Sequence, residues 1–175
     1  MKIRKLLTGF AVAAVAVLAV GLGAAPANAA TIGVCTIQAQ NPHPSTHVNG
    51  TINGVGTVNC TSSVPEIYIY VVLQKSTGES WANPSRDYAN TSSQQNNGAS
   101  PCSAGPGIFR VETQYAITFP AGASPAYSAG AVDSPWMQVA CGSARVAAVD
   151  LSGNPVPDDG STATTSVTFE PPAID

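Results

Sequence analysis

The fold is decided by the stretch Glu66-Ile67-Tyr68-Ile69-Tyr70-Val71-Val72-Leu73-Gln74. In an extended chain, successive side chains point to opposite faces, so residues two apart share a face. One face receives four aliphatic side chains, from Ile67, Ile69, Val71 and Leu73. Tyr68 and Tyr70 fall on the other face. This period of two, with no helical spacing of three or four, predicts a β-strand with one aliphatic and one aromatic face.

The same alternation recurs outward from this stretch. Ile108–Phe119 is the second clearest strand, and shorter ones are expected at Gly33–Ala39, Gly50–Cys60, Trp136–Cys141, Ala144–Leu151 and Ala163–Glu170. Prolines fall between these segments, as connecting loops require. The polar stretch Ser76–Ala104 is expected to be irregular, with Ser92–Gly98 as a mobile loop. Short strands at this density predict an all-β fold, a single antiparallel immunoglobulin-like β-sandwich.

The first 29 residues differ in kind from the rest. Met1–Lys5 is basic, Leu6–Leu22 is almost uninterruptedly apolar, and Ala27-x-Ala29 offers the small residues that a signal peptidase requires. This order predicts a cleaved secretory signal peptide, residues 1–29, and one mature domain, residues 30–175. The alternative is a membrane anchor, since 17 apolar residues approach the length of a spanning helix. The processing site favours cleavage, so we expect a secreted, extracellular protein without membrane association.

The charge of the mature chain restricts its partners. Three of the seven basic residues lie in the signal segment, which leaves four against ten acidic residues, a net charge of −6. So few cations release few counterions from a phosphate backbone, and nucleic acid is therefore not an expected partner. Anionic membrane surfaces are disfavoured for the same reason.

The mature chain contains four cysteines, Cys35, Cys60, Cys102 and Cys141. An even number in an exported chain predicts two disulfides, and four cysteines allow three pairings. We favour Cys35–Cys60 with Cys102–Cys141, because each pair would then link neighbouring strands of a meander. A zinc site is disfavoured, because the spacings of 25, 42 and 39 residues contain no close pair of ligands.

Two segments carry resemblances. Arg145–Asn154, followed by Ser166–Phe169, resembles the closing hairpin of bacterial immunoglobulin-like domains, which read V-x-A-x-D-x-x-G-N before the last strand. Cys35-x-Ile37, then Asn41-Pro42-His43-Pro44-Ser45-Thr46-His47-Val48-x-Gly50-Thr51, then Val58-x-Cys60-Thr61, resembles small exported β-proteins of high-GC Gram-positive bacteria. The second resemblance implies a secreted β-protein built around these cysteines. Neither implies an activity or a catalytic residue.

Aromatic residues are the candidate ligand-binding groups. Tyr68 and Tyr70 share one face of their strand, and Trp81 and Trp136 lie in or near expected loops. Aligned exposed rings could stack on a sugar ring or anchor a protein partner. The alternative is that both tyrosines pack the second face of a central strand. The expected partner is thus an extracellular protein or carbohydrate.

The two histidines, His43 and His47, are expected in an exposed, proline-flanked loop. Two imidazoles are too few for a metal site unless Asp158-Asp159 completes it, and flanking prolines disfavour a helix that would align them. A Ser-His-Asp hydrolase lacks the G-x-S-x-G turn. We therefore expect no catalytic residue, metal or cofactor, and rank a non-enzymatic extracellular binding module first. A secreted inhibitor or small-ligand carrier acting through Asn41–His47 comes second, and a small extracellular hydrolase third.

Overall fold

The computed structural model describes residues 32–45, 47–141, 147–155 and 162–170. The expected signal peptide, residues 1–29, and the Asp158-Asp159 turn lie outside these ranges. The strands are β1 Gly33–Ala39, β2 His43–Pro44, β3 Thr51–Lys75, β4 Ser80–Ala82, β5 Arg86–Pro101, β6 Gly107–Thr118, β7 Tyr127–Asp133, β8 Met137–Val139, β9 Ala147–Ala148 and β10 Ala163–Phe169. A 3-10 turn, η1, covers Cys102–Ala104. Within these ranges, no helix is both long and apolar enough to cross a membrane.

Strand β3 organises the sheet. It joins two strands that the sequence predicts separately, Gly50–Cys60 and Glu66–Gln74, into one strand of 25 residues. Its first half pairs with β1 and its second half with β6, while β5 pairs along both halves. All pairings are antiparallel, and they form one sheet in the order β10-β1-β3-β6-β8-β9, with β2, β4, β5 and β7 at its sides.

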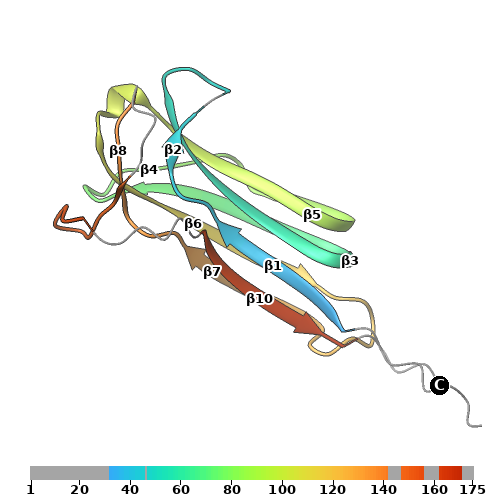
Figure 1. The fold of residues 1–175 in the computed structure, drawn as a ribbon. Coiled ribbons are helices and arrows are strands. Elements are labelled where there is room, and N and C mark those ends of the chain that lie inside the picture. The colour runs from blue at the N-terminus through green and yellow to red at the C-terminus, as the bar shows by residue number, and fades with distance from the viewer. Residues whose placement is uncertain (1–31, 46, 142–146, 156–161, 171–175) are drawn as a thin grey trace, which may run out of the picture.

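This sheet folds over on itself, so that its two halves face each other across a core. The register between β3 and β5 shifts between Asn59 and Val64, and this segment, Asn59–Val64, forms the corner. A Cβ atom added at Gly56 would lie 2.6 Å from the Cγ2 atom of Val71, in the second half of the same strand. Figure 1 shows β1 and β10 lying over β6 and β7.

The core confirms the predicted alternation. The four aliphatic residues of the second half of β3, Ile67, Ile69, Val71 and Leu73, are fully buried. They pack in one cluster with Ile37 of β1 and with Phe109 and Ile117 of β6, which are also fully buried. Burying one such side chain stabilises the folded state by about 1.5–3 kcal/mol. The predicted all-β antiparallel architecture is therefore confirmed.

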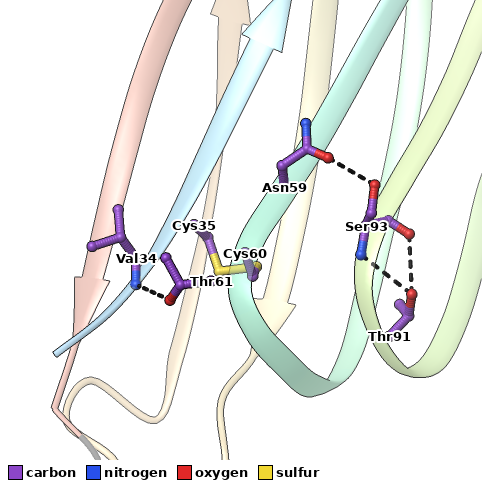
Figure 2. The surroundings of a disulfide bond; sticks show 7 residues. All are labelled: Val34, Cys35, Asn59, Cys60, Thr61, Thr91 and Ser93. Atoms are coloured by element: carbon purple, nitrogen blue, oxygen red, sulfur yellow. Dashed lines mark hydrogen bonds between the residues drawn. A yellow bond between two sulfur atoms is a disulfide. The ribbon is translucent and has the colours of Figure 1, made fainter. Parts of the chain in front are cut away.

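Both disulfides have the expected pairing. Cys35 and Cys60 are directly opposite in the β1–β3 register, with their Cα atoms 3.9 Å apart, and Figure 2 shows their bond beside the corner. Cys102 pairs with Cys141, which ties η1 to the segment that follows β8. Two hydrogen bonds lie on either side of this disulfide and hold the bent strands together. The Val34 N–H donates to Thr61 Oγ1, and Ser93 Oγ of β5 donates to Asn59 Oδ1 of β3.

The prediction of an irregular Ser76–Ala104 is wrong, because this stretch contains β4 and the 16-residue β5. The expected mobile loop Ser92–Gly98 lies within β5. Asn, Gly and Ser are depleted in strands, but pairing along both halves of β3 outweighs that preference. Strand β7 was also not expected, because its apolar residues are mostly small alanines and its outward side is exposed.

The segment Asp150–Asn154 closes a tight turn within the motif that resembles immunoglobulin-like domains. Asp150 Oδ1 accepts hydrogen bonds from the backbone N–H groups of Ser152 and Asn154, and Oδ2 accepts one from the Asn154 side chain. These donors, the Asn154 side chain first, hold the pKa of Asp150 below its ordinary value. The Asp150 carboxylate therefore adds three hydrogen bonds to a turn that backbone bonds of Asp150 with Gly153 and Asn154 also close.

Candidate functional site

The outward side of β3 (Glu66–Gln74), β6 and β7 forms a surface that we call the tyrosine face. Tyr68 and Tyr70 lie there, half-buried and opposite Ala116 and Gln114 of β6. Residues directly opposite in an antiparallel pair share a face, so β7 continues the surface with its exposed outward residues Tyr127, Ala129, Ala131 and Asp133. Tyr127 is 57% exposed.

A hydrogen-bonded network crosses the tyrosine face. Arg110 Nε donates to Gln74 Oε1 at 2.6 Å, and Gln74 Nε2 donates to Glu112 Oε2 at 2.7 Å. Gln114 Nε2 donates to the second oxygen of Glu112 at 2.6 Å. Arg110 also forms an ion pair with Asp133 at 2.8 Å. These contacts hold the guanidinium, amide and carboxylate groups of the network in fixed orientations.

Trp136 lies at the Arg110 end of this network. The Arg110 Cζ atom is 4.9 Å from the centre of the Trp136 ring, which is a cation–π contact. Three of the four aromatic residues predicted to bind ligand, Tyr68, Tyr70 and Trp136, thus belong to one surface with its polar network.

Trp81 does not join them. It lies opposite Leu73, whose side chain points inward, and its ring centre is 6.2 Å from that of Phe109 in the core. Its place on Ser80–Ala82, an edge strand that the sequence did not indicate, explains the difference. Tyr127 was missed as a member of the face because small residues surround it and obscure the alternation of β7.

The two histidines border a separate hollow, which we call the histidine groove. It consists of two adjoining hollows of about 360 and 230 Å³. Both are lined by Ser45, His47, Asn53, Val55 and Gln95. The larger is also lined by Val48, Thr51, Asn83, Asn97 and Ala99, and the smaller by Gln40 and His43. His43 is not in a free loop, because it belongs to β2 and pairs with Asn53. His47 is exposed, as expected.

The side chains that line the groove carry hydroxyl, amide, imidazole and aliphatic groups. His43 Nδ1 lies 3.0 Å from the carbonyl of Asn41, which can only accept, so Nδ1 carries a proton. Ser45 Oγ accepts hydrogen bonds from the backbone N–H groups of His47 and Val48, and it thereby caps a turn. Among the described residues, none that lines either hollow carries a carboxylate. In the described part of the chain, no three His, Cys, Asp or Glu side chains gather as a metal site would require.

No protein-family model, curated protein or solved structure matches this chain.

Proposed function

We propose that this protein is exported through the signal segment 1–29 and that residues 30–175 act outside the cell as a non-enzymatic binding module. The observation that carries the proposal is the tyrosine face, where aromatic rings and an ordered polar network share one exposed surface. Its ligand is an extracellular carbohydrate or protein. The two disulfides support this compartment, because such bonds form and persist in oxidising environments.

The composition of the face suits recognition. Aromatic rings contribute large contact areas at low cost in side-chain entropy, and they dominate the energetics of many interfaces. Because Arg110, Gln74 and Glu112 already hold one another, a ligand need not order them on binding, which preserves affinity. Antiparallel strands under the face supply a rigid support.

An immunoglobulin-like arrangement is part of the same proposal. It is supported by two layers that face each other across one core and by the Asp150 turn at the position that the resemblance assigns to the closing hairpin. The Cys35–Cys60 bond supports the kinship with small exported β-proteins of high-GC Gram-positive bacteria, because that resemblance is built around these two cysteines.

The test is binding of labelled residues 30–175 to a glycan array and to an array of secreted proteins. We expect a specific ligand whose binding is lost in Tyr68→Ala/Tyr70→Ala. The matched control is Tyr88→Ala, which removes a tyrosine that is 46% exposed but lies opposite the inward-facing Ile67. If the double variant binds the ligand as tightly as the unchanged protein, the tyrosine face is not the binding site. If no specific ligand is found on either array, the proposal of a binding module is refuted.

A further inference from the structure

The histidine groove lies on the outward side of the first half of β3, in the layer away from the tyrosine face. We propose that it is a second binding site and that its ligand is a neutral, hydroxyl-rich molecule of the size of a mono- or disaccharide. This inference does not rest on the proposed function of the tyrosine face, because the two surfaces share no residue.

Three adjacent strands build the floor of the groove. His43 of β2 lies opposite Asn53 of β3, which lies opposite Ala99 of β5, and Val55 lies opposite Asn97 in the next row. Strand β3 is paired on both sides at Asn53, so the ladders occupy its backbone there. A peptide that recognises a sheet by adding a strand would find no free edge at this position. A ligand therefore meets side chains.

The described lining favours uncharged ligands over charged ones. Among the described residues that line the two hollows, none is Lys, Arg, Asp or Glu, and the ionisable side chains are those of His43 and His47. Phosphates and carboxylates are usually bound by Arg or Lys, and metal cations such as Ca²⁺ by carboxylate oxygens. The described lining offers neither kind of group, which favours a neutral ligand.

The polar groups of the groove form an oriented row of amides. Asn83 Nδ2 donates to Asn97 Oδ1 at 3.0 Å, and Asn97 Nδ2 donates to Asn53 Oδ1 at 2.9 Å. This direction leaves the Asn53 NH₂ group as a donor. Among the described residues, the Gln95 side chain makes no hydrogen bond, so both its donor and its acceptor are available. Hydroxyl groups both donate and accept, and an amide next to an amide can bind two neighbouring hydroxyls.

Apolar contacts complete the match to a sugar. Val55 is 8% exposed at the floor, Val48 is 58% exposed at the rim, and Ala99 lies beside Asn53. The C–H groups of a sugar ring can pack on such aliphatic surface while its hydroxyls reach the amides. The larger hollow, about 360 Å³, falls within the range of roughly 300–1,000 Å³ that small-molecule sites occupy.

The test is an NMR titration of ¹⁵N-labelled residues 30–175 with maltose, cellobiose and N,N′-diacetylchitobiose. Glucose 6-phosphate and tetra-alanine serve as the charged and peptide probes. We expect at least one neutral disaccharide to shift the side-chain NH₂ signals of Asn53, Asn97 and Gln95 in a saturable way. Loss of one hydrogen bond should weaken binding about fivefold in Gln95→Ala. Asn97→Ala also breaks the bonds to Asn83 and Asn53, so it should weaken binding by at least as much.

Gln95→Ala is the decisive variant, because a side chain without a partner in the protein can be removed without harm to folding. Gln138→Ala removes an exposed amide on β8, outside the groove, and should leave the affinity unchanged. Three outcomes would overturn the inference. They are no saturable shift with any neutral disaccharide, stronger shifts with the phosphorylated sugar or the peptide, and sugar-induced shifts that map to the tyrosine face, which would leave the proposed function intact.

Discussion

Gly56→Ala tests the claim that β3 folds back against itself. A methyl group at this position would overlap Thr113 Oγ1 and lie 2.6 Å from Val71 Cγ2, and both of these side chains are fully buried. Neither has a flexible end that can move away, because each is short and β-branched. The backbone at Gly56 does not have the positive φ that disfavours alanine, so the cost is one of packing alone.

The magnitude follows from two opposing terms. Overpacking of a filled core costs about 1–3 kcal/mol, and the direct contacts at Gly56 place the variant toward the upper end. Replacing glycine by alanine returns about 0.4–1 kcal/mol, because it restricts the unfolded chain. We therefore expect the free energy of unfolding to fall by about 2 kcal/mol.

The assay is urea denaturation of residues 30–175 with both disulfides intact, followed by circular dichroism. Gly107→Ala is the matched control, because its methyl group would meet the Cε and Cδ atoms of the long Lys75 side chain, at 2.6 and 3.6 Å, and a ring atom of Phe109 at 3.4 Å. Lys75 can move by giving up the hydrogen bond from its Nζ to the Ala104 carbonyl, which costs about 1 kcal/mol, so we expect a smaller loss than in Gly56→Ala. Equal stability of the two variants would show that the halves of β3 are not packed together.

Three further variants test other contacts. Cys35→Ala/Cys60→Ala should lower the free energy of unfolding by about 3 kcal/mol in the same assay, because the bond spans 25 residues; an unchanged urea midpoint would contradict this. The pKa of Asp150 is lowered in the folded state, so its contribution to stability is complete above its unfolded pKa of about 3.9 and is lost as the pH falls through the folded value. In an NMR titration, Asn154→Ala should raise that pKa, and no change would rule out these hydrogen bonds as its cause. Asn96→Ala should cost about 1–3 kcal/mol, because the buried Asn96 amide donates to two backbone carbonyls; calorimetry showing no fall in Tm would refute it.

The strands that alternate between large apolar and polar residues could be predicted from the sequence. Gly33–Ala39 is a strand with the predicted bounds, and Ile108–Phe119 differs from β6 by one residue at each end. Both bury a continuous aliphatic or aromatic row, and this is the signal that periodicity detects. The Cys35–Cys60 pairing follows from the same signal, because both strands that it links are visible in the sequence. The Cys102–Cys141 pairing is also the predicted one, but this bond ties the 3-10 turn η1 to the segment after β8 and not two strands to each other.

The polar strand β5 could not be predicted. Its inward positions are Asn96, Gly98 and Ser100, which carry no hydrophobic signal, and its stability comes from pairing with β3. The histidine groove could not be foreseen for the same reason, since Gln95 and Asn97 of β5 form part of its lining. The tyrosine face was visible in Tyr68 and Tyr70, but its hydrogen-bonded network depends on the register between β3 and β6.

The continuity of β3 around the corner has a mechanical consequence. The same strand carries Asn53 and Val55 on one outer surface and Tyr68 and Tyr70 on the other. If ligands held at the two surfaces were pulled apart, the load would run as tension along one covalent backbone, through the residue that the Cys35–Cys60 bond anchors. In a sandwich of two separate sheets, the same load would shear one sheet off the other. The backbone of β3, and not the packing between the two layers, would then carry the load.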